Sequence, residues 1–200
     1  MLHRRDVRGN NFLNTPVSAD EINQILNAAS LAPSVGYSQP WQFVVIKDHE
    51  VKRRIHDSFD SENEKAKTHF EGERKQAYTK LKLEGIHESP VNIAVFYNPV
   101  DGPVLGQNSM PEVGEYSVVC AVQNMWLMAR ALNIGIGWVS ILDSNKVKEI
   151  LKAPAQNKLV AYLCVGHVKE FYSKPELERL KWGERKPLQS VVFTDGYPVS

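Results

Sequence analysis

Three arginines stand within five residues near the start of the chain, at Arg4, Arg5 and Arg8. The planar guanidinium group of arginine binds phosphate through paired hydrogen bonds, and it does so better than the ammonium group of lysine. The alternative is a solvated basic segment in which Asp6 is a surface ion-pair partner. The cluster therefore indicates a phosphate site or an exposed basic end, and by itself leaves both open.

A second candidate segment, residues 32–41, carries hydroxyl groups, a flexible glycine, an amide and an indole. Such a loop can present Ser34 and Gln39 to the polar edge of a planar heterocycle while Trp41 packs beneath. A helix-breaking loop that anchors Trp41 explains the segment equally well.

Glycines also precede a third candidate, at Gly135 and Gly137. The glycines of a dinucleotide fingerprint follow a strand and open a helix, so this arrangement excludes a Rossmann site. It predicts instead a close backbone approach and a strand that exposes Ser140. Near the end of the chain, Arg185 either folds back to complete an anion site or belongs to an exposed basic tail.

Regular elements must position these residues. A capping box at Ser18 and Glu21 predicts a helix over residues 18–31, which Pro33 ends. Asp143 is placed to cap a short helix. The almost wholly apolar run 115–132 predicts a helix in the core or in a subunit interface. Strands are expected over residues 42–46, 91–97, 137–142 and 159–168, the second of them covered on both faces.

Residues 48–88 are rich in charge, which favours exposed helices, and residues 98–114 form a loop rich in proline and glycine. Strands and helices mix without strict alternation, so the fold class is α+β. The length of 200 residues suits a single domain. We therefore expect one domain over residues 1–200.

Composition excludes several classes of function. With 24 basic and 23 acidic residues the net charge is +1, which gives no general attraction to nucleic acid or to a membrane surface. No apolar run is long enough for a membrane span, and the start of the chain lacks the apolar segment of a signal peptide, so we expect a cytoplasmic protein. Cys120 and Cys164 are expected to be reduced, buried thiols. The histidines are scattered, so no metal site is predicted.

Together and in this order, the motifs at Arg4–Arg8, 32–41, 135–140 and 185–188 resemble the FMN-dependent nitroreductase superfamily. Further segments at 81–86, 116–124 and 175–177 resemble its flavin-destroying branch, which makes 5,6-dimethylbenzimidazole, the lower ligand of cobalamin. Ordinary nitroreductases usually carry serine where this chain has Asp6. The resemblance spans about residues 4–196.

The resemblance implies a nitroreductase-like fold with a central mixed sheet flanked by helices, in an intertwined homodimer with two FMN sites between the subunits. A helical lid would cover the flavin at about residues 60–88. Pro33, Ser34 and Gln39 would reach the flavin from the partner chain. The implied FMN-binding residues are Arg4, Arg5, Asp6, Val7, Arg8, Pro33, Ser34, Gln39, Arg74, Leu83, Trp138, Val139, Ser140 and Arg185.

The implied reaction is the oxidative fragmentation of FMNH2, consumed as a substrate, with O2 as co-substrate and no metal. Asp6 would be the catalytic acid or base, kept ionised by the neighbouring arginines, and Ser140 would orient the ring. A separate NAD(P)H-dependent flavin reductase is an expected partner, because the chain shows no nicotinamide motif. The alternatives are an NAD(P)H-dependent FMN nitro- or quinone reductase and a non-catalytic flavin-binding protein.

Overall fold

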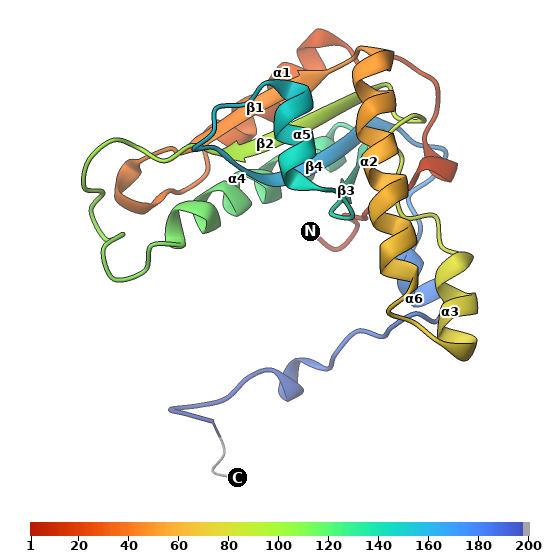
Figure 1. Ribbon diagram of the computed structural model, residues 1–200. Coiled ribbons are helices and arrows are strands. Elements are labelled where there is room, and N and C mark those ends of the chain that lie inside the picture. The colour runs from red at the N-terminus through yellow and green to blue at the C-terminus, as the bar shows by residue number, and fades with distance from the viewer. Residues whose placement is uncertain (198–200) are drawn as a thin grey trace.

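The computed structural model describes residues 1–197, so the last three residues of the predicted domain lie outside the described residues. Its centre is a four-stranded sheet in the order β1-β2-β4-β3 (Figure 1). The strands are β1 (Trp41–Ile46), β2 (Val91–Tyr97), β3 (Ile134–Val139) and β4 (Lys158–His167). Six of the seven residues of β2 are buried, which confirms that this apolar strand is covered on both faces.

The expected mixed sheet is wrong for these four strands, because all their ladders are antiparallel. The parallel component is one isolated bridge, between Asp6 and Ile136. It arises because the arginine-rich start of the chain runs beside β3, the edge strand of the sheet. The α+β class is confirmed.

Helices cover both faces of the sheet. One face packs on α1 (Ala19–Ser30) and α4 (Val113–Ala131), and the other on α2 (His49–Lys67) and α5 (Ser144–Leu151). The short helices α3 (Gly72–Thr79) and α6 (Glu176–Arg179) lie side by side beyond the sheet, near the end of α2 (Figure 1). No helix within residues 1–197 is both long and apolar enough to cross a membrane.

The predicted helix caps are confirmed. Ser18 Oγ accepts a hydrogen bond from the amide of Glu21, and the Glu21 carboxylate accepts one from the amide of Ser18 at 2.8 Å. Asp143 Oδ1 accepts hydrogen bonds from the first amides of α5. These side chains replace partners that the first turn of a helix lacks, so α1 and α5 begin where the sequence indicates.

Helix α4 is buried on one face and exposed on the other. Val118 and Met125 are fully buried, whereas Tyr116 is 51% exposed and Val119 is 41% exposed. Cys120 lies on the exposed face, so the prediction of two buried thiols is wrong for it, while Cys164 on β4 is buried. An apolar helix over a single sheet can bury only one stripe of its surface within one chain.

Strand β3 begins and ends three residues before the predicted span 137–142. Its glycines belong to the strand because another backbone passes directly over them. A Cβ atom on Gly137 would lie 2.0 Å from the carbonyl oxygen of Val7, and one on Gly135 would lie 2.8 Å from the side chain of Val7. The predicted close approach is thus confirmed, and Ser140 follows the strand instead of lying inside it.

Residues 183–197, here called the C-terminal arm, run away from the body of the molecule (Figure 1). The arm carries apolar side chains in exposed positions, with Leu188 at 69%, Phe193 at 49% and Tyr197 at 83% exposure. Its first residues, Gly183 to Lys186, line cavities together with the body of the chain.

Candidate active site

Asp6 is positioned by the edge of the sheet. The amide of Val7 donates to the carbonyl oxygen of Ile136 at 3.0 Å, and the amide of Trp138 donates to Asp6 Oδ1 at 2.9 Å. The start of the chain is thereby fastened along β3, with the Asp6 carboxyl at the end of the strand. Asp6, Val7, Trp138 and the buried Val139 are brought together as the sequence predicted.

Arg8 joins three segments that are distant in sequence. Its Nη2 forms an ion pair with Asp6 Oδ2 at 2.5 Å. Its Nη1 donates to the carbonyl oxygens of Leu83 at 2.9 Å and Trp138 at 3.1 Å. The Arg8 side chain is only 16% exposed, so these bonds form largely out of water. Arg8 therefore ties the predicted lid to the sheet and directs the Asp6 carboxyl.

The balance of forces on Asp6 differs from the expectation that the arginines keep it ionised. Burial of the carboxyl raises its pKa, and this effect outweighs the lowering by Arg8, the Trp138 amide and Arg4. Desolvation disfavours the charged form of an acid, and here it is the largest cause. The net pKa of Asp6 is above its ordinary value, which favours holding a proton more than the sequence suggested.

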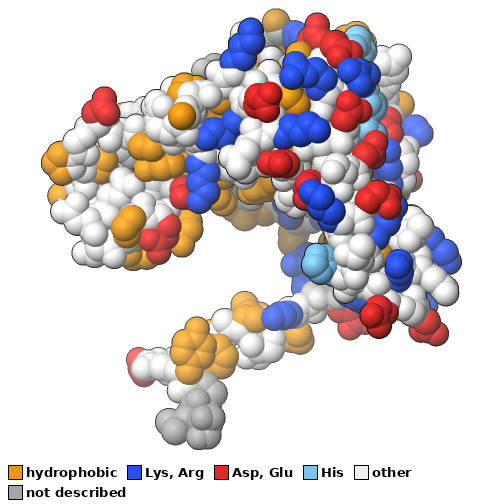
Figure 2. All heavy atoms as spheres, in the orientation of Figure 1, with side chains coloured by type: hydrophobic (Ala, Val, Ile, Leu, Met, Phe, Trp, Pro, Cys, Tyr) orange, Lys and Arg blue, Asp and Glu red, His pale blue; other side chains and the backbone are white. Residues whose placement is uncertain are grey.

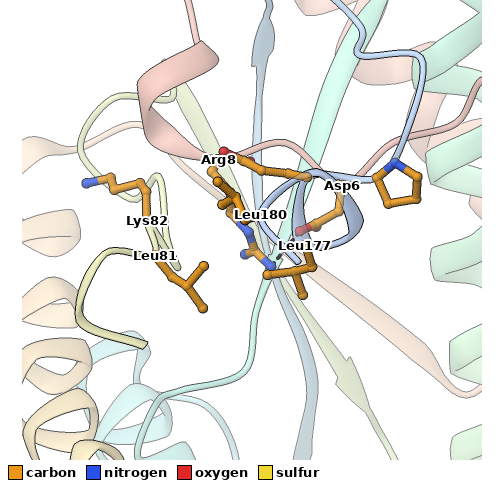
Figure 3. A pocket seen from close by; sticks show the side chains of 8 residues that line it. Asp6, Arg8, Leu81, Lys82, Leu177 and Leu180 are labelled. Carbon is orange, nitrogen blue, oxygen red and sulfur yellow. Dashed lines mark ion pairs between the residues drawn. The ribbon is translucent and has the colours of Figure 1, made fainter. Parts of the chain in front are cut away.

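Asp6 and Arg8 open on a cavity of about 100 Å³ (Figure 3). Its other lining residues are Leu81, Lys82, Pro175, Glu176, Leu177 and Leu180. The cavity is mostly apolar, with Asp6 and Arg8 as an ion pair at its wall. It is smaller than the roughly 300–1,000 Å³ usual for ligand sites, so this cavity alone does not enclose a whole flavin nucleotide.

A second, larger cavity of about 530 Å³ adjoins it at Pro175 and has a basic lining. Arg4, Arg5, Lys174 and Arg185 line it together with a single acidic residue, Glu178. Several cations around one acid suit a phosphate group. This donor set fits the phosphate of FMN, and Lys174 is a member that the sequence analysis missed.

The arginines of the basic cavity are not equivalent. The Arg5 guanidinium donates to the carbonyl oxygens of Leu2, Arg4, Tyr172 and Ser173, so most of its hydrogen atoms already have partners. The Arg4 guanidinium lies 4.7 Å from the ring centroid of Trp126, a contact through one face of the group. Arg5 thus holds the C-terminal segment in place, while Arg4 and Arg185 keep hydrogen-bond donors for a ligand.

The base of the predicted lid contains a buried carboxylate that the sequence analysis did not single out. Glu84 is 2% exposed, accepts a hydrogen bond from the amide of Ile86 at 2.6 Å and pairs with Lys82. Its carbonyl oxygen accepts from the amide of Gly9 at 2.8 Å. A charge in a dense polar segment gives no sequence signal of burial, so only the fold reveals this anchor.

Other predicted site residues lie elsewhere. Ser34 Oγ accepts from the amide of Gln39 at 3.1 Å, and the adjoining Val35 amide donates to Ser117 on α4. This loop, with Pro33, lies at the opposite end of the sheet from α3 and α6 (Figure 1). Within one chain, Pro33, Ser34 and Gln39 do not meet Asp6.

The remaining predicted residues lie around the cavities. Ser140 is exposed directly after β3. Arg74 on α3 packs on the ring of Trp182, and Leu83 contributes its backbone oxygen to Arg8. Among residues 1–197, no group of three or more histidine, cysteine, aspartate or glutamate side chains is placed to hold a metal ion.

The fold and this site define a class of protein. The chain belongs to the nitroreductase family, whose family model matches residues 1–167. It is 46% identical over 186 residues to 5,6-dimethylbenzimidazole synthase of Rhodospirillum rubrum, covering 92% of this chain and 87% of that protein. It is 36% identical to the 5,6-dimethylbenzimidazole synthase of Rhodobacter capsulatus, covering 93% and 90%. The resemblance stated from the motifs is thereby confirmed.

Solved structures support the same fold. A BluB-like flavoprotein from Clostridium difficile superposes with a TM-score of 0.70 at 19% identity, covering 96% of this chain and 95% of that one. Iodotyrosine deiodinase bound to FMN and 3-iodo-L-tyrosine gives a TM-score of 0.75 at 19% identity, covering 98% and 100%. At this identity the likeness establishes the fold alone.

Proposed function

We propose that this protein fragments reduced FMN with O2 and releases 5,6-dimethylbenzimidazole. The observation that carries the proposal is the Asp6 carboxyl, held at the wall of an apolar cavity by the Trp138 amide and Arg8. Ordinary nitroreductases usually have serine at this position. The identity of 46% to a 5,6-dimethylbenzimidazole synthase supports the same reaction.

Binding of the substrate follows from the two adjoining cavities. The basic cavity with Arg4, Lys174 and Arg185 would hold the phosphate, and Arg5 would support its wall. The ring would then lie toward Asp6, Val7, Trp138, Val139 and Ser140. Bound FMNH2 supplies the ring that is broken and the electrons that O2 accepts.

Asp6 is proposed as the group that moves protons. The Trp138 amide donates to Oδ1 and Arg8 pairs with Oδ2, so both oxygens of the carboxyl are held in place. A carboxyl whose pKa is raised by burial holds and releases a proton nearer to neutral pH than an ordinary aspartate does. Ser140 is proposed to orient the ring through its hydroxyl, because it is exposed directly after β3.

A homodimer would complete the site. Pro33, Ser34 and Gln39 lie at the far end of the same chain, away from the two cavities. A second copy would bring those residues to the flavin. The exposed apolar face of α4, with Tyr116 and Val119, and the C-terminal arm supply surface for such an assembly. We therefore keep the predicted intertwined dimer as part of the proposal.

The lid is proposed to comprise α3 and residues 80–88, which agrees with the predicted range of about 60–88 only in its second half. The first part of that range is the end of α2, a continuous helix over His49–Lys67. Arg8 grips the base of the segment at Leu83, while α3 packs on few other elements. Arg74 and Leu83 would act through this lid.

A direct test supplies purified protein with FMNH2 in the absence of oxygen, admits O2 and identifies the products by mass spectrometry. We expect 5,6-dimethylbenzimidazole. Reoxidation to intact FMN would refute the proposal, and steady NAD(P)H oxidation by a yellow protein would favour the nitro- or quinone reductase. Tight FMN binding without either activity would favour a flavin-binding protein.

The source of FMNH2 is proposed to be a separate NAD(P)H-dependent flavin reductase in the cytoplasm. Adding such a reductase with NADPH should replace chemically reduced flavin in the assay. If this protein alone reduces FMN with NADPH, no such partner is needed.

A further inference from the structure

Trp182 lies against α3, outside every motif that the function uses. Its ring centroid is 3.8 Å from the guanidinium carbon of Arg74 and 5.4 Å from the ring of Phe70, which it meets edge to face. Tyr78 lies 6.1 Å away and also stacks on Phe70 at 4.9 Å. A cation and three aromatic rings thus join α3 to the segment that follows α6.

The other end of that segment is held by the arginine-rich start of the chain. Arg5 Nε donates to the carbonyl oxygen of Tyr172 at 2.8 Å, and the Arg179 guanidinium lies 3.7 Å from the ring of Tyr172. The amide of Trp182 donates to the carbonyl oxygen of Leu177 at 2.8 Å, which fixes the backbone of Trp182 to the turn of α6. Residues 172–182 therefore form a strap anchored at both ends.

The strap forms one wall of the cavity on which Asp6 opens. Leu177 and Leu180 line it from the strap, and Leu81 lines it from the segment after α3 (Figure 3). Trp182 and Leu81 also line a neighbouring surface hollow together with Leu180. The stack of Trp182 on Arg74 thus links α3, which precedes Leu81, to the strap that carries Leu177 and Leu180.

We propose that Trp182 is a positioning residue that closes the cavity over Asp6 by clasping α3 to the strap. This inference rests on the proposed function. Trp182 does not line the cavity beside Asp6, so it acts through Leu177, Leu180 and Leu81 and is not a catalytic residue. Arg74, predicted to bind FMN, is part of this clasp.

An open cavity would admit water to the site of the oxygen reaction. In the competing reaction, FMNH2 transfers two electrons and two protons to O2 and yields FMN and hydrogen peroxide. Exclusion of water is a general way in which closed sites suppress such side reactions. Loss of the clasp should therefore change the ratio of the two products more than it changes the rate of flavin oxidation.

The experiment compares the intact chain with Trp182→Ala, Trp182→Phe and Arg74→Met. Lys75→Met is the matched control, since it removes the neighbouring charge on the same helix, at an exposed position that does not contact Trp182. Hydrogen exchange of residues 72–83 reports the clasp without any turnover. Product yield per FMNH2 oxidised, with hydrogen peroxide as the remainder, reports its effect on the reaction.

We expect exchange in residues 72–83 to be about tenfold faster in Trp182→Ala, with β2 and β4 unchanged. Trp182→Phe should recover most of the protection, Arg74→Met should lie between, and Lys75→Met should match the unaltered protein. The yield of 5,6-dimethylbenzimidazole should fall and hydrogen peroxide should rise by the same amount.

Unchanged exchange in Trp182→Ala would overturn the clasp. Faster exchange with an unchanged product ratio would overturn the positioning role. If the unaltered protein itself produces only FMN and hydrogen peroxide, the proposed function fails. The product ratio then says nothing about Trp182, but hydrogen exchange still decides whether the clasp exists.

Discussion

The two ends of the sheet differ in whether their side chains find partners within the chain. At the Asp6 end, Arg5 and Arg8 bind backbone carbonyl oxygens of their own chain. At the opposite end, Leu31, Tyr37 and Leu105 are 81%, 83% and 85% exposed. Figure 2 shows charged side chains gathered over α2 and hydrophobic side chains over the loops at the other end. The Asp6 end is tied together by hydrogen bonds within the chain, whereas the opposite end leaves large apolar side chains exposed.

The largest effect on product formation should come from substitution of Asp6. Asp6→Asn keeps the shape of the side chain but removes the acid, so the rate of 5,6-dimethylbenzimidazole formation should fall about 1,000-fold. Mass spectrometry of the product and equilibrium titration with FMN would separate chemistry from binding, which should persist. Asp101→Asn, in the loop after β2, is the matched control. Unchanged yields in Asp6→Asn would remove Asp6 from the catalytic set, and the same test applies to Ser140→Gly.

The second effect tests how far the stability of the Asp6 end of the sheet depends on the bonds of Arg8. Arg8→Ala leaves Asp6 without its partner and frees the carbonyl oxygens of Leu83 and Trp138. The free energy of unfolding should fall by about 3 kcal/mol, as for the loss of one member of a largely buried ion pair. Urea denaturation measures this change. Arg53→Ala is the control, because Arg53 makes ion pairs only with exposed Glu50 and Asp57, and it should change stability little.

The third effect concerns the apolar end. Val119→Glu places a charge on the exposed face of α4 and should weaken self-association about 100-fold if that face is an interface. Sedimentation over a range of concentrations would measure it, with Arg54→Glu on the exposed side of α2 as a control. If the unaltered protein is a monomer, or if both substitutions weaken self-association equally, the exposed face of α4 is not a specific interface.

The smallest effect is on pH dependence. Because the pKa of Asp6 is raised in the folded protein, its contribution to stability is fully present below the unfolded pKa of about 4. That contribution is lost as the pH rises through the higher folded pKa. The difference in unfolding free energy between the unaltered protein and Asp6→Asn should therefore decline with rising pH. A difference that grows with pH would show that Arg8 outweighs burial.

Elements with local signals could be predicted from the sequence. The capping box at Ser18, the cap at Asp143 and the apolar run of β2 depend on residues a few positions apart, and all three are confirmed. The span of β3 was misplaced because Gly135 and Gly137 disfavour a strand when judged alone. Glycine is required at both positions because Val7, distant in sequence, passes so close that a Cβ atom would collide with it.

The candidate site could be predicted in its residue types but not in its connections. The motifs named Asp6 and Arg8, yet the partners of Arg8 at Leu83 and Trp138 are joined only by the fold. Trp182 lies in a C-terminal segment with little periodicity in its apolar residues, so nothing in the sequence indicated its stack on Arg74. Burial of the Asp6 carboxyl likewise depends on surrounding segments, so its effect on the pKa of Asp6 had no signal in the sequence.

The docking of the first residues on β3 has a consequence for biosynthesis. Asp6 leaves the ribosome early, but the Trp138 amide that binds it follows 132 residues later. Closing so long a loop becomes possible only after most of the chain has been translated. The start of the chain must therefore wait, unpaired, while the sheet assembles, and the Asp6 carboxyl is among the first groups synthesised and among the last to reach its place.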